Sequence, residues 1–272
     1  MAVTFDTLKS DATIFVELNK NPEWWKRFKE DPSLYIEIRK DNQVNVYFEG
    51  GSVAKIHYCS KHKKLQVFTH KKYLNEDSDK SYLECSDRIE KKIGTILEAV
   101  KYCYSEKNKS DNFFPKEKWS EKYIQGSLIV KNRSIHLDSE FAYIDADSDI
   151  RIDLVKCADG VVTFVELKRM DDNRMLHITD DTPEVVFQMR RYKQFIGKYA
   201  SQLLSYYQRV YDIKKFLGLL VPTKRPEKIN LTPELLIFDR WVKETNGRKE
   251  HCQRLYKILD RNGIKYYTRT EI

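Results

Sequence analysis

Residues 151–169, with the sequence RIDLVKCADGVVTFVELKR, decide the fold of the second half of this chain. Two runs rich in β-branched residues flank Asp159-Gly160. This dipeptide is among the strongest signals for a two-residue hairpin turn, because both turn residues need a positive φ. The stretch therefore predicts two antiparallel strands in which Ala158 pairs with Val161.

The predicted hairpin brings charged residues together on one face. Counting outward from the turn places Asp153 opposite Glu166 and Arg151 opposite Lys168. Opposed side chains lie on the same face, with Cβ atoms about 4.5–5.5 Å apart. A bulge would shift this register by one residue. The other face is apolar and suits a core: Ile150, Ile152, Leu154, Val165 and Leu167.

Two facing carboxylates repel each other unless a cation lies between them. Mg²⁺ prefers carboxylate oxygens together with water and phosphate oxygens, so Asp153 and Glu166 form a candidate metal site. Lys168 is then placed to stabilise developing negative charge or to help position a hydroxide nucleophile. The alternative is a surface hairpin in which Arg151 and Lys168 offset the two acids.

Ile152-Asp153, twelve further residues and Glu166-Leu167-Lys168 together resemble the signature of the PD-(D/E)XK nucleases, with Ile152 in place of the proline. The resemblance implies that Asp153 and Glu166 bind Mg²⁺, for which Mn²⁺ is a possible substitute, and that Lys168 assists the attacking water. The resemblance covers residues 118–222. It implies an α/β fold with a restriction-endonuclease-like mixed sheet flanked by helices.

A second match lies downstream of the hairpin. Residues 188–192, QMRRY, form a Gln-x-x-x-Tyr sequence within a helical pattern, and residues i and i+4 of a helix lie on one face. The RecB-like branch of the superfamily has such a pair near its active site. This implies that Gln188 and Tyr192 line the site and contact DNA or the metal-bound water. Without the resemblance, the pair indicates only a polar helix face with a packed tyrosine.

The superfamily often adds a glutamate from a helix that precedes these strands. Glu121 lies in a helical pattern that begins near Ser120, and it is the candidate for an additional metal ligand or metal-water contact. Glu140 is nearer to the hairpin in sequence, but it lies in a strand-like stretch. We expect Glu121 to take this place and keep Glu140 as the rival.

The composition is that of a globular protein. Its 272 residues include 49 Lys and Arg against 41 Asp and Glu, a net charge of +8, which raises the expectation of a nucleic-acid partner only modestly. No stretch approaches the apolar length needed to cross a membrane. Five cysteines without repeated spacing favour a reduced, cytoplasmic protein. Neither a phosphate-binding P-loop nor a serine-hydrolase elbow is present.

Residues 1–110 predict a separate, smaller α+β domain, which is a possible substrate-recognition module. A short helical run with aromatic residues at 24–28 opens it, and residues 89–104 follow a helical period near its end. The polar stretch 105–118 places the domain boundary near 110. Between the two helical runs, four period-two stretches predict an antiparallel meander: 35–39, 44–48, 55–58 and 65–68.

Residues 111–272 predict the nuclease-like α/β domain, because strand-like and helical stretches are mixed along it. Helices are expected near 119–124, at 184–211 and at 249–260. The expected strands are 135–144, 150–157, 161–167, 216–221, 235–238 and 264–267.

We expect this protein to bind and cut DNA, with RNA as an open alternative. A non-catalytic module that binds nucleic acid or protein on the same fold is the rival function. A homodimer is a further possibility, since many superfamily nucleases dimerise to cut both strands. The candidate nucleic-acid contacts are basic residues beside the predicted site and in a lysine-rich stretch of the first domain: Arg151, Arg169, Arg190, Arg191, Lys63 and Lys64. The lysines suit a protected hairpin edge equally well.

Overall fold

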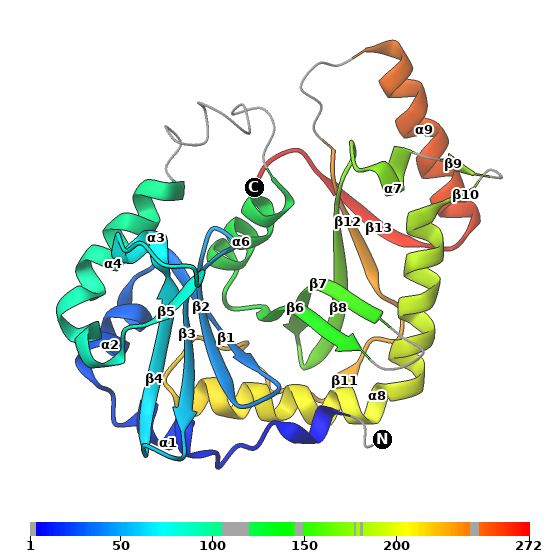
Figure 1. Cartoon of the computed structure of the whole chain (residues 1–272). Helices are drawn as coiled ribbons and strands as arrows, with labels where there is room; N and C mark the ends of the chain where they lie inside the picture. The colour runs from blue at the N-terminus through cyan, green and yellow to red at the C-terminus, as the bar shows by residue number, and fades with distance from the viewer. Residues whose placement is uncertain (1–3, 105–119, 145–148, 177, 180–181, 240–244) are drawn as a thin grey trace.

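The computed structural model describes residues 4–104, 120–144, 149–176, 178–179, 182–239 and 245–272. The predicted domain boundary near residue 110 lies outside these ranges. Two large sheets, a separate two-stranded pair and the helices around them make up the described part of the chain (Figure 1).

The first sheet, called here the N-terminal sheet, confirms the predicted meander. Its five strands are antiparallel and follow each other in chain order, β1-β2-β3-β4-β5. The fifth and shortest strand was not predicted. The strands are β1 (Leu34–Arg39), β2 (Gln43–Phe48), β3 (Gly51–Cys59), β4 (Lys64–His70) and β5 (Tyr82–Glu84).

Short helices and one long helix accompany the N-terminal sheet. The long helix is α4, and its apolar residues at helical spacing, among them Ile89, Ile93 and Val100, are buried as the period predicts. The elements are η1 (Thr4–Thr7), α1 (Thr13–Asn19), α2 (Glu23–Glu30), α3 (Lys71–Leu74), η2 (Ser86–Arg88) and α4 (Ile89–Tyr104).

The second sheet, called here the mixed sheet, has the order β13-β12-β8-β7-β6, with β11 also paired to β8. Strands β6, β7 and β8 are antiparallel, whereas β8, β12 and β13 run parallel. The strands are β6 (His136–Ile144), β7 (Asp149–Ala158), β8 (Val161–Arg169), β11 (Lys228–Ile229), β12 (Glu234–Phe238) and β13 (Lys265–Arg269). A separate small pair is formed by β9 (Ile178–Thr179) and β10 (Thr182–Pro183).

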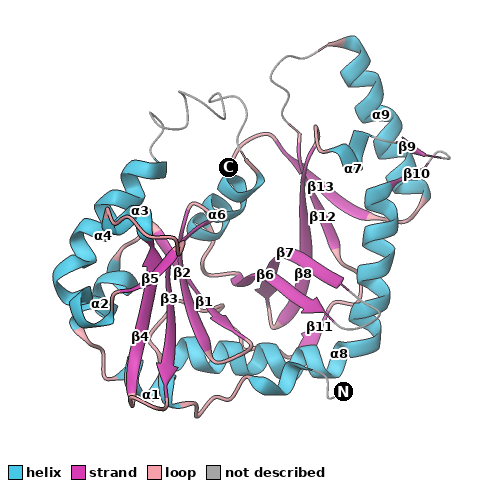
Figure 2. Cartoon of the chain, viewed as in Figure 1, coloured by secondary structure: helices cyan, strands magenta, loops and turns pink. Residues whose placement is uncertain are grey.

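Two helices cover opposite faces of the mixed sheet (Figure 2). Val162 and Phe164 of β8 share the larger core cluster with helix α8, whereas Val165 and Leu167 share the smaller cluster with helix α6. The core therefore lies on both sides of β8, and the chain is a mixed α/β protein with helices flanking the mixed sheet. The helices of this half are α6 (Glu121–Lys131), α7 (Asn173–Leu176), α8 (Glu184–Phe216) and α9 (Asn246–Arg261).

Helix α8 also joins the two halves of the chain. It bends at Tyr199, where φ is −114° and ψ is 18°, and the segment after the bend runs toward the N-terminal sheet (Figure 1). There the buried Lys214 Nζ lies 2.7 Å from Glu37 Oε2 of β1 and donates to the carbonyl of Leu137 in β6. The larger core cluster likewise contains residues of both halves, from Phe5 to Leu259.

The strand predicted at 216–221 is wrong. Helix α8 continues to Phe216 with Leu217 as its C-cap, and Gly218 follows with a φ of +70°. The Leu219 amide donates to the Lys214 carbonyl and the Gly218 amide to the Lys215 carbonyl, which is the pattern of a glycine-terminated helix. Phe216 and Leu220 are exposed, so the apolar run that indicated a buried strand is a helix end and a loop.

No helix in the part of the chain that the structure describes is both long and apolar enough to cross a lipid bilayer. The long helix α8 carries buried and charged positions along its whole length.

The left-handed conformation of Gly218 predicts a stability difference between two glycine substitutions. Gly218→Ala places a Cβ in a strained backbone conformation and should lower the free energy of unfolding by about 1 kcal/mol. Gly197 lies within α8, where an added Cβ atom would meet no other atom within 4 Å, so Gly197→Ala should stabilise the protein by about 0.5–1 kcal/mol. Urea unfolding of both variants measures the difference, and equal effects of the same sign would contradict this account.

Candidate active site

The predicted hairpin is present, with the predicted turn and register. Asp159 and Gly160 have φ values of 51° and 79°, as the two-residue turn requires. The strands pair from Ala158 with Val161 to Leu154 with Val165. The regular pairing between β7 and β8 ends at Leu154 and Val165. The expected pairs of Asp153 with Glu166 and of Arg151 with Lys168 therefore do not belong to this ladder.

The alternation of side chains along β7 breaks at Asp153. Ile150 and Ile152 before it and Val155 and Cys157 after it all belong to the larger core cluster, which a regular strand would not allow. The expectation that Ile150, Ile152, Leu154, Val165 and Leu167 share one face is therefore wrong, since the last three lie in the smaller cluster. Irregularities of this kind re-aim side chains next to functional sites.

Backbone groups around the irregularity are satisfied by side chains instead of a strand partner. The Leu167 amide donates to Asp153 Oδ2 at 2.8 Å, and Gln125 Nε2 of α6 donates to the Asp153 carbonyl at 2.6 Å. The Tyr192 hydroxyl of α8 donates to the Arg151 carbonyl. Because buried backbone polar groups need partners, these bonds fix where α6 and α8 lie relative to β7.

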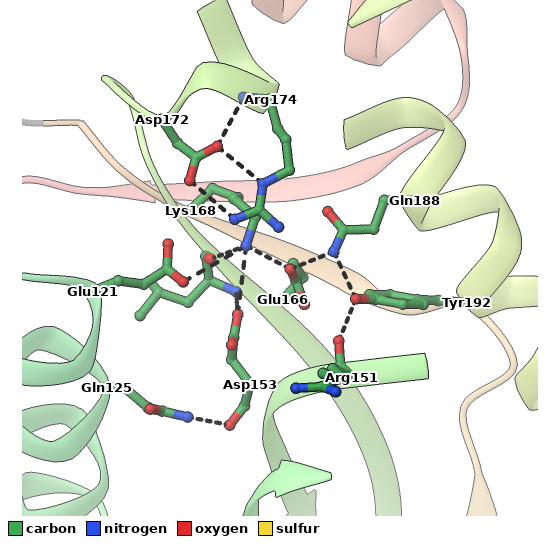
Figure 3. Close-up of polar contacts among 11 residues, drawn as sticks. Glu121, Gln125, Arg151, Asp153, Glu166, Lys168, Asp172, Arg174, Gln188 and Tyr192 are labelled. Carbon is green, nitrogen blue, oxygen red and sulfur yellow. Dashed lines mark hydrogen bonds and ion pairs between the residues drawn. The ribbon is translucent and has the colours of Figure 1, made fainter. Parts of the chain in front are cut away.

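Lys168 is the centre of the site (Figure 3). Its side chain is 1% exposed, and its ammonium lies 2.5 Å from Glu166 Oε1, 3.7 Å from Asp153 Oδ2 and 3.8 Å from Glu121 Oε1. It also donates to the Leu167 carbonyl at 2.8 Å. The structure thus brings three predicted metal ligands, from α6, β7 and β8, around the predicted catalytic lysine.

The Gln-x-x-x-Tyr pair lies against the same carboxylates. Gln188 Nε2 donates to Glu166 Oε1 at 2.7 Å and to the Tyr192 hydroxyl oxygen at 2.6 Å. One turn of α8 separates the two residues, so both point at β7 and β8 from the same helix face. We refer to these two residues together with Glu121, Asp153, Glu166 and Lys168 as the site cluster.

Glu121, and not Glu140, belongs to the site cluster. Helix α6 begins directly after Ser120, whose hydroxyl accepts a hydrogen bond from the Tyr123 amide, and this cap places Glu121 in the first turn. Glu140 is exposed on β6, has a φ of 51°, and lines a cavity with Arg39 and Asp138 away from Lys168.

Electrostatics leave the site cluster short of positive charge. Three carboxylates around one ammonium give a net charge of −2 when all are ionised. Burial, and then the charge of Asp153, raise the pKa of Glu166 to about 8 against the opposing effect of Lys168. Burial likewise raises the pKa of Glu121 to about 7. The same carboxylates raise the pKa of Lys168 although its burial lowers it. The cluster therefore favours a bound proton or an additional cation.

Two buried oxygens fit a hard cation. Among the described residues, Glu166 Oε2 and Gln188 Oε1 have no hydrogen-bond partner, and carboxylate and amide oxygens are ligands that Mg²⁺ accepts. However, no group of three or more His, Cys, Asp or Glu side chains within the described ranges is already arranged as a ligand set. In this arrangement Lys168 draws the carboxylates together. The donor types and the charge of the site fit Mg²⁺.

Sequence reasoning missed three residues at the site, Gln125, Asp172 and Arg174. Gln125 is buried and holds the Asp153 carbonyl, and its position four residues after Glu121 on one helix face was an available signal. Arg174 donates two hydrogen bonds to Asp172, each 3.1 Å long (Figure 3). The hydrogen bonds to Asp172 raise the pKa of Arg174 most, and the charges of Glu121 and Glu166 raise it further. No spacing rule pointed to Arg174.

The predicted nucleic-acid contacts lie in different places. The side chain of Arg151 is exposed beside Asp149, Arg169 pairs with Asp171, and Arg190 donates to Asn262. Arg191 is exposed on α8 next to Tyr192.

The two lysines of the first half are not brought to the site. Lys63 and Lys64 lie at the turn between β3 and β4, and Lys64 pairs with Asp87 at 2.8 Å. This turn and the end of β8 that carries Lys168 lie at opposite sides of the molecule (Figure 1).

Comparison with protein-family models, with curated proteins and with solved structures found no match to this chain.

The pKa of Glu166 predicts that stability falls as the pH rises. The folded state binds this proton more tightly than the unfolded state, whose carboxyl titrates near 4.5. The contribution to stability is complete below about pH 4.5 and is lost as the pH rises through about 8. In metal-free buffer, the free energy of unfolding from urea titrations should fall by on the order of a few kcal/mol between about pH 5 and pH 8.5.

Glu166→Gln tests the source of this dependence, because it removes the titrating group and keeps its shape. The unfolding free energy of this variant should depend less on pH than that of the parent. Glu140→Gln changes an exposed glutamate outside the site cluster and serves as the matched control, with the parental dependence. The same pH dependence in Glu166→Gln as in the parent would show that another group is responsible.

Proposed function

We propose that this protein is a metal-dependent nuclease that hydrolyses phosphodiester bonds in DNA, on a fold of the restriction-endonuclease type. The observation that carries the proposal is the convergence of Asp153, Glu166 and Lys168 with the Gln188–Tyr192 pair and Glu121. These residues come from α6, β7, β8 and α8, and they meet within hydrogen-bond or ion-pair distance around one buried ammonium.

The site cluster supplies the groups that this reaction needs. Asp153 and Glu166 would hold Mg²⁺, with Glu121 as an additional ligand or a contact to its water, and Mg²⁺ would supply positive charge at the scissile phosphate. Lys168 would orient the attacking water and stabilise the negative charge that develops on the phosphate. Gln188 holds Glu166 in place through its amide, while Tyr192 anchors β7 through the Arg151 carbonyl.

Charge supports a polyanionic substrate. The chain carries a net charge of +8, and exposed basic side chains such as Arg191 and Arg151 lie on the elements that form the site. Phosphate contacts of this kind position a nucleic acid without reading its sequence. The site cluster carries a local excess of negative charge when its three carboxylates are ionised, and a divalent cation would balance it.

One observation favours a second candidate, a non-catalytic binding module. The 2.5 Å contact between Lys168 and Glu166 compensates part of the carboxylate charge without any metal. Titration calorimetry separates the two functions. A nuclease site should bind Mg²⁺ and Mn²⁺ with release of protons, because the protonated carboxyls must ionise. A site that ignores both ions would support the binding module.

A substrate panel tests the proposed reaction directly. The full chain is incubated with linear, circular, single-stranded and double-stranded DNA, and with RNA, in Mg²⁺ and in EDTA. Cleavage that requires Mg²⁺ supports the proposal. Cleavage of circular DNA would identify an endonuclease, since an exonuclease needs a free end. Absence of cleavage of every substrate in both Mg²⁺ and Mn²⁺ would exclude it.

Two substitutions predict loss of cleavage with the fold intact. Asp153→Ala removes a metal ligand, and Lys168→Ala removes the group that orients water, so each should lower the cleavage rate by about 10²–10⁴-fold. Circular dichroism checks the fold. Glu140→Gln is the control and should cleave like the parent. Parental activity in either alanine variant would mean that the site is assigned to the wrong residues.

A further inference from the structure

Helix α6 meets the N-terminal sheet backbone to backbone. A Cβ atom on Gly126 of α6 would lie 2.5 Å from the Gly50 nitrogen and 2.8 Å from the Glu49 carbonyl carbon. A Cβ atom on Gly50 would lie 2.4 Å from the Lys122 carbonyl oxygen. Real Cβ atoms essentially never come within 3.0 Å of such neighbours. The approach seen here therefore requires glycine at both positions.

The turn that receives α6 has a defined shape. Glu49 and Gly50, between β2 and β3, have φ values of 48° and 81°. Both lie in the left-handed region, which residues other than glycine rarely adopt. The β2–β3 pairing is irregular between Val46 and Tyr47, just before this turn. The turn is thus a backbone surface whose position is set by the N-terminal sheet.

A different face of the same helix serves the site cluster. Gln125, the residue before Gly126, is buried and donates to the Asp153 carbonyl at 2.6 Å. Glu121, in the first turn of α6, places Oε1 3.8 Å from Lys168 Nζ. Any shift of α6 along the direction of the Gly126 contact therefore moves the groups that touch Asp153 and Lys168.

Side-chain packing holds α6 between the two sheets. Tyr35 and Tyr47 of the N-terminal sheet share the smaller core cluster with Ile124 and Leu128 of α6. Val165 and other residues of the mixed sheet complete that cluster. Figure 1 shows α6 lying between the two sheets, with the β2–β3 turn beside it.

We propose that the contact between Gly50 and Gly126 positions the active site: the N-terminal sheet sets the place of α6 and thereby the place of the Glu121 carboxylate and the Gln125 amide. The N-terminal half is then part of the metal site's support and not only a module that reads substrate. This inference rests on the proposed nuclease function, because it names what determines the geometry of that same site.

Gly126→Ala in the full chain tests the proposal. Alanine is a better helix former than glycine by about 1 kcal/mol, so a loss cannot come from helix propensity. The added Cβ displaces α6 from the turn, and Mg²⁺ affinity measured by calorimetry should fall by about 10- to 100-fold, as for other residues that orient metal ligands. The control is Gly247→Ala in α9, where a Cβ meets no atom within 4 Å and affinity should not change.

A double-mutant cycle separates positioning from a general loss of structure. If Gly126 acts through Glu121 and Gln125, the effect of Gly126→Ala on Mg²⁺ affinity should largely disappear in a background that carries both Glu121→Gln and Gln125→Ala. An equal loss in both backgrounds would overturn the proposal. A folded Gly126→Ala protein with parental affinity would overturn it as well.

A gentler variant covers the case in which Gly126→Ala does not fold. Tyr35→Leu trims the packing of the N-terminal sheet on α6 without adding an atom, and it should weaken Mg²⁺ binding in the same direction by a smaller factor. Unchanged Mg²⁺ affinity in folded Tyr35→Leu would then refute the inference.

The inference and the proposed function fail separately. If the parent binds no Mg²⁺ and cuts no DNA, the proposed function fails. Crystal structures of the parent and Gly126→Ala then decide the positioning role alone. An unchanged Glu121–Lys168 distance in the variant would refute that role.

Discussion

The site depends on the ion pairs that the buried ammonium of Lys168 forms with the surrounding carboxylates. A charge that is 1% exposed is costly unless opposite charges and hydrogen-bond acceptors surround it. Glu166 on the same strand compensates part of the charge, and Asp153 of β7 and Glu121 of α6 approach it from two other elements. Three segments that are distant in the sequence are therefore held at one point by electrostatics as well as by apolar packing.

The compensation exceeds what one ammonium requires, and that excess gives the site its chemical character. A purely structural ion pair needs one carboxylate, whereas here three share the surroundings of Lys168, and the pKa values of Glu121 and Glu166 are raised to about 7 and about 8. Perturbed carboxylates of this kind are typical of functional sites. They give the site cluster an affinity for a proton or a divalent cation.

The two helices beside the mixed sheet have different tasks. Helix α8 brings Gln188 to Glu166 and ties its far end to the N-terminal sheet through Lys214 and Glu37. Helix α6 brings Glu121 and Gln125 to the other side of the strands and lies directly on the turn at Gly50. Both halves of the chain thus support the site on β7 and β8. A division of the sequence into two domains near residue 110 does not show this shared support.

The amino-acid sequence by itself determined the features that depend on neighbours a few residues apart. Asp159-Gly160 specified the turn and the first five strand pairs, the helical period specified α4, and the four-residue spacing put Gln188 and Tyr192 on one face. These relations follow from backbone geometry alone. Together with the resemblance to a nuclease signature, they pointed to five of the six residues of the site cluster in the hairpin and the helix after it, with Glu121 as the favoured sixth.

Only the tertiary structure decided the relations between distant elements. The break in alternation at Asp153 depends on donors from Leu167 and Gln125, and the choice of Glu121 over Glu140 depends on where α6 packs. The apolar run at 216–221 became a helix end because Gly218 adopts a positive φ. The close approach of Gly50 and Gly126 has no local sequence signature. It joins the β2–β3 turn to helix α6, so it exists only once the two halves of the chain are packed together.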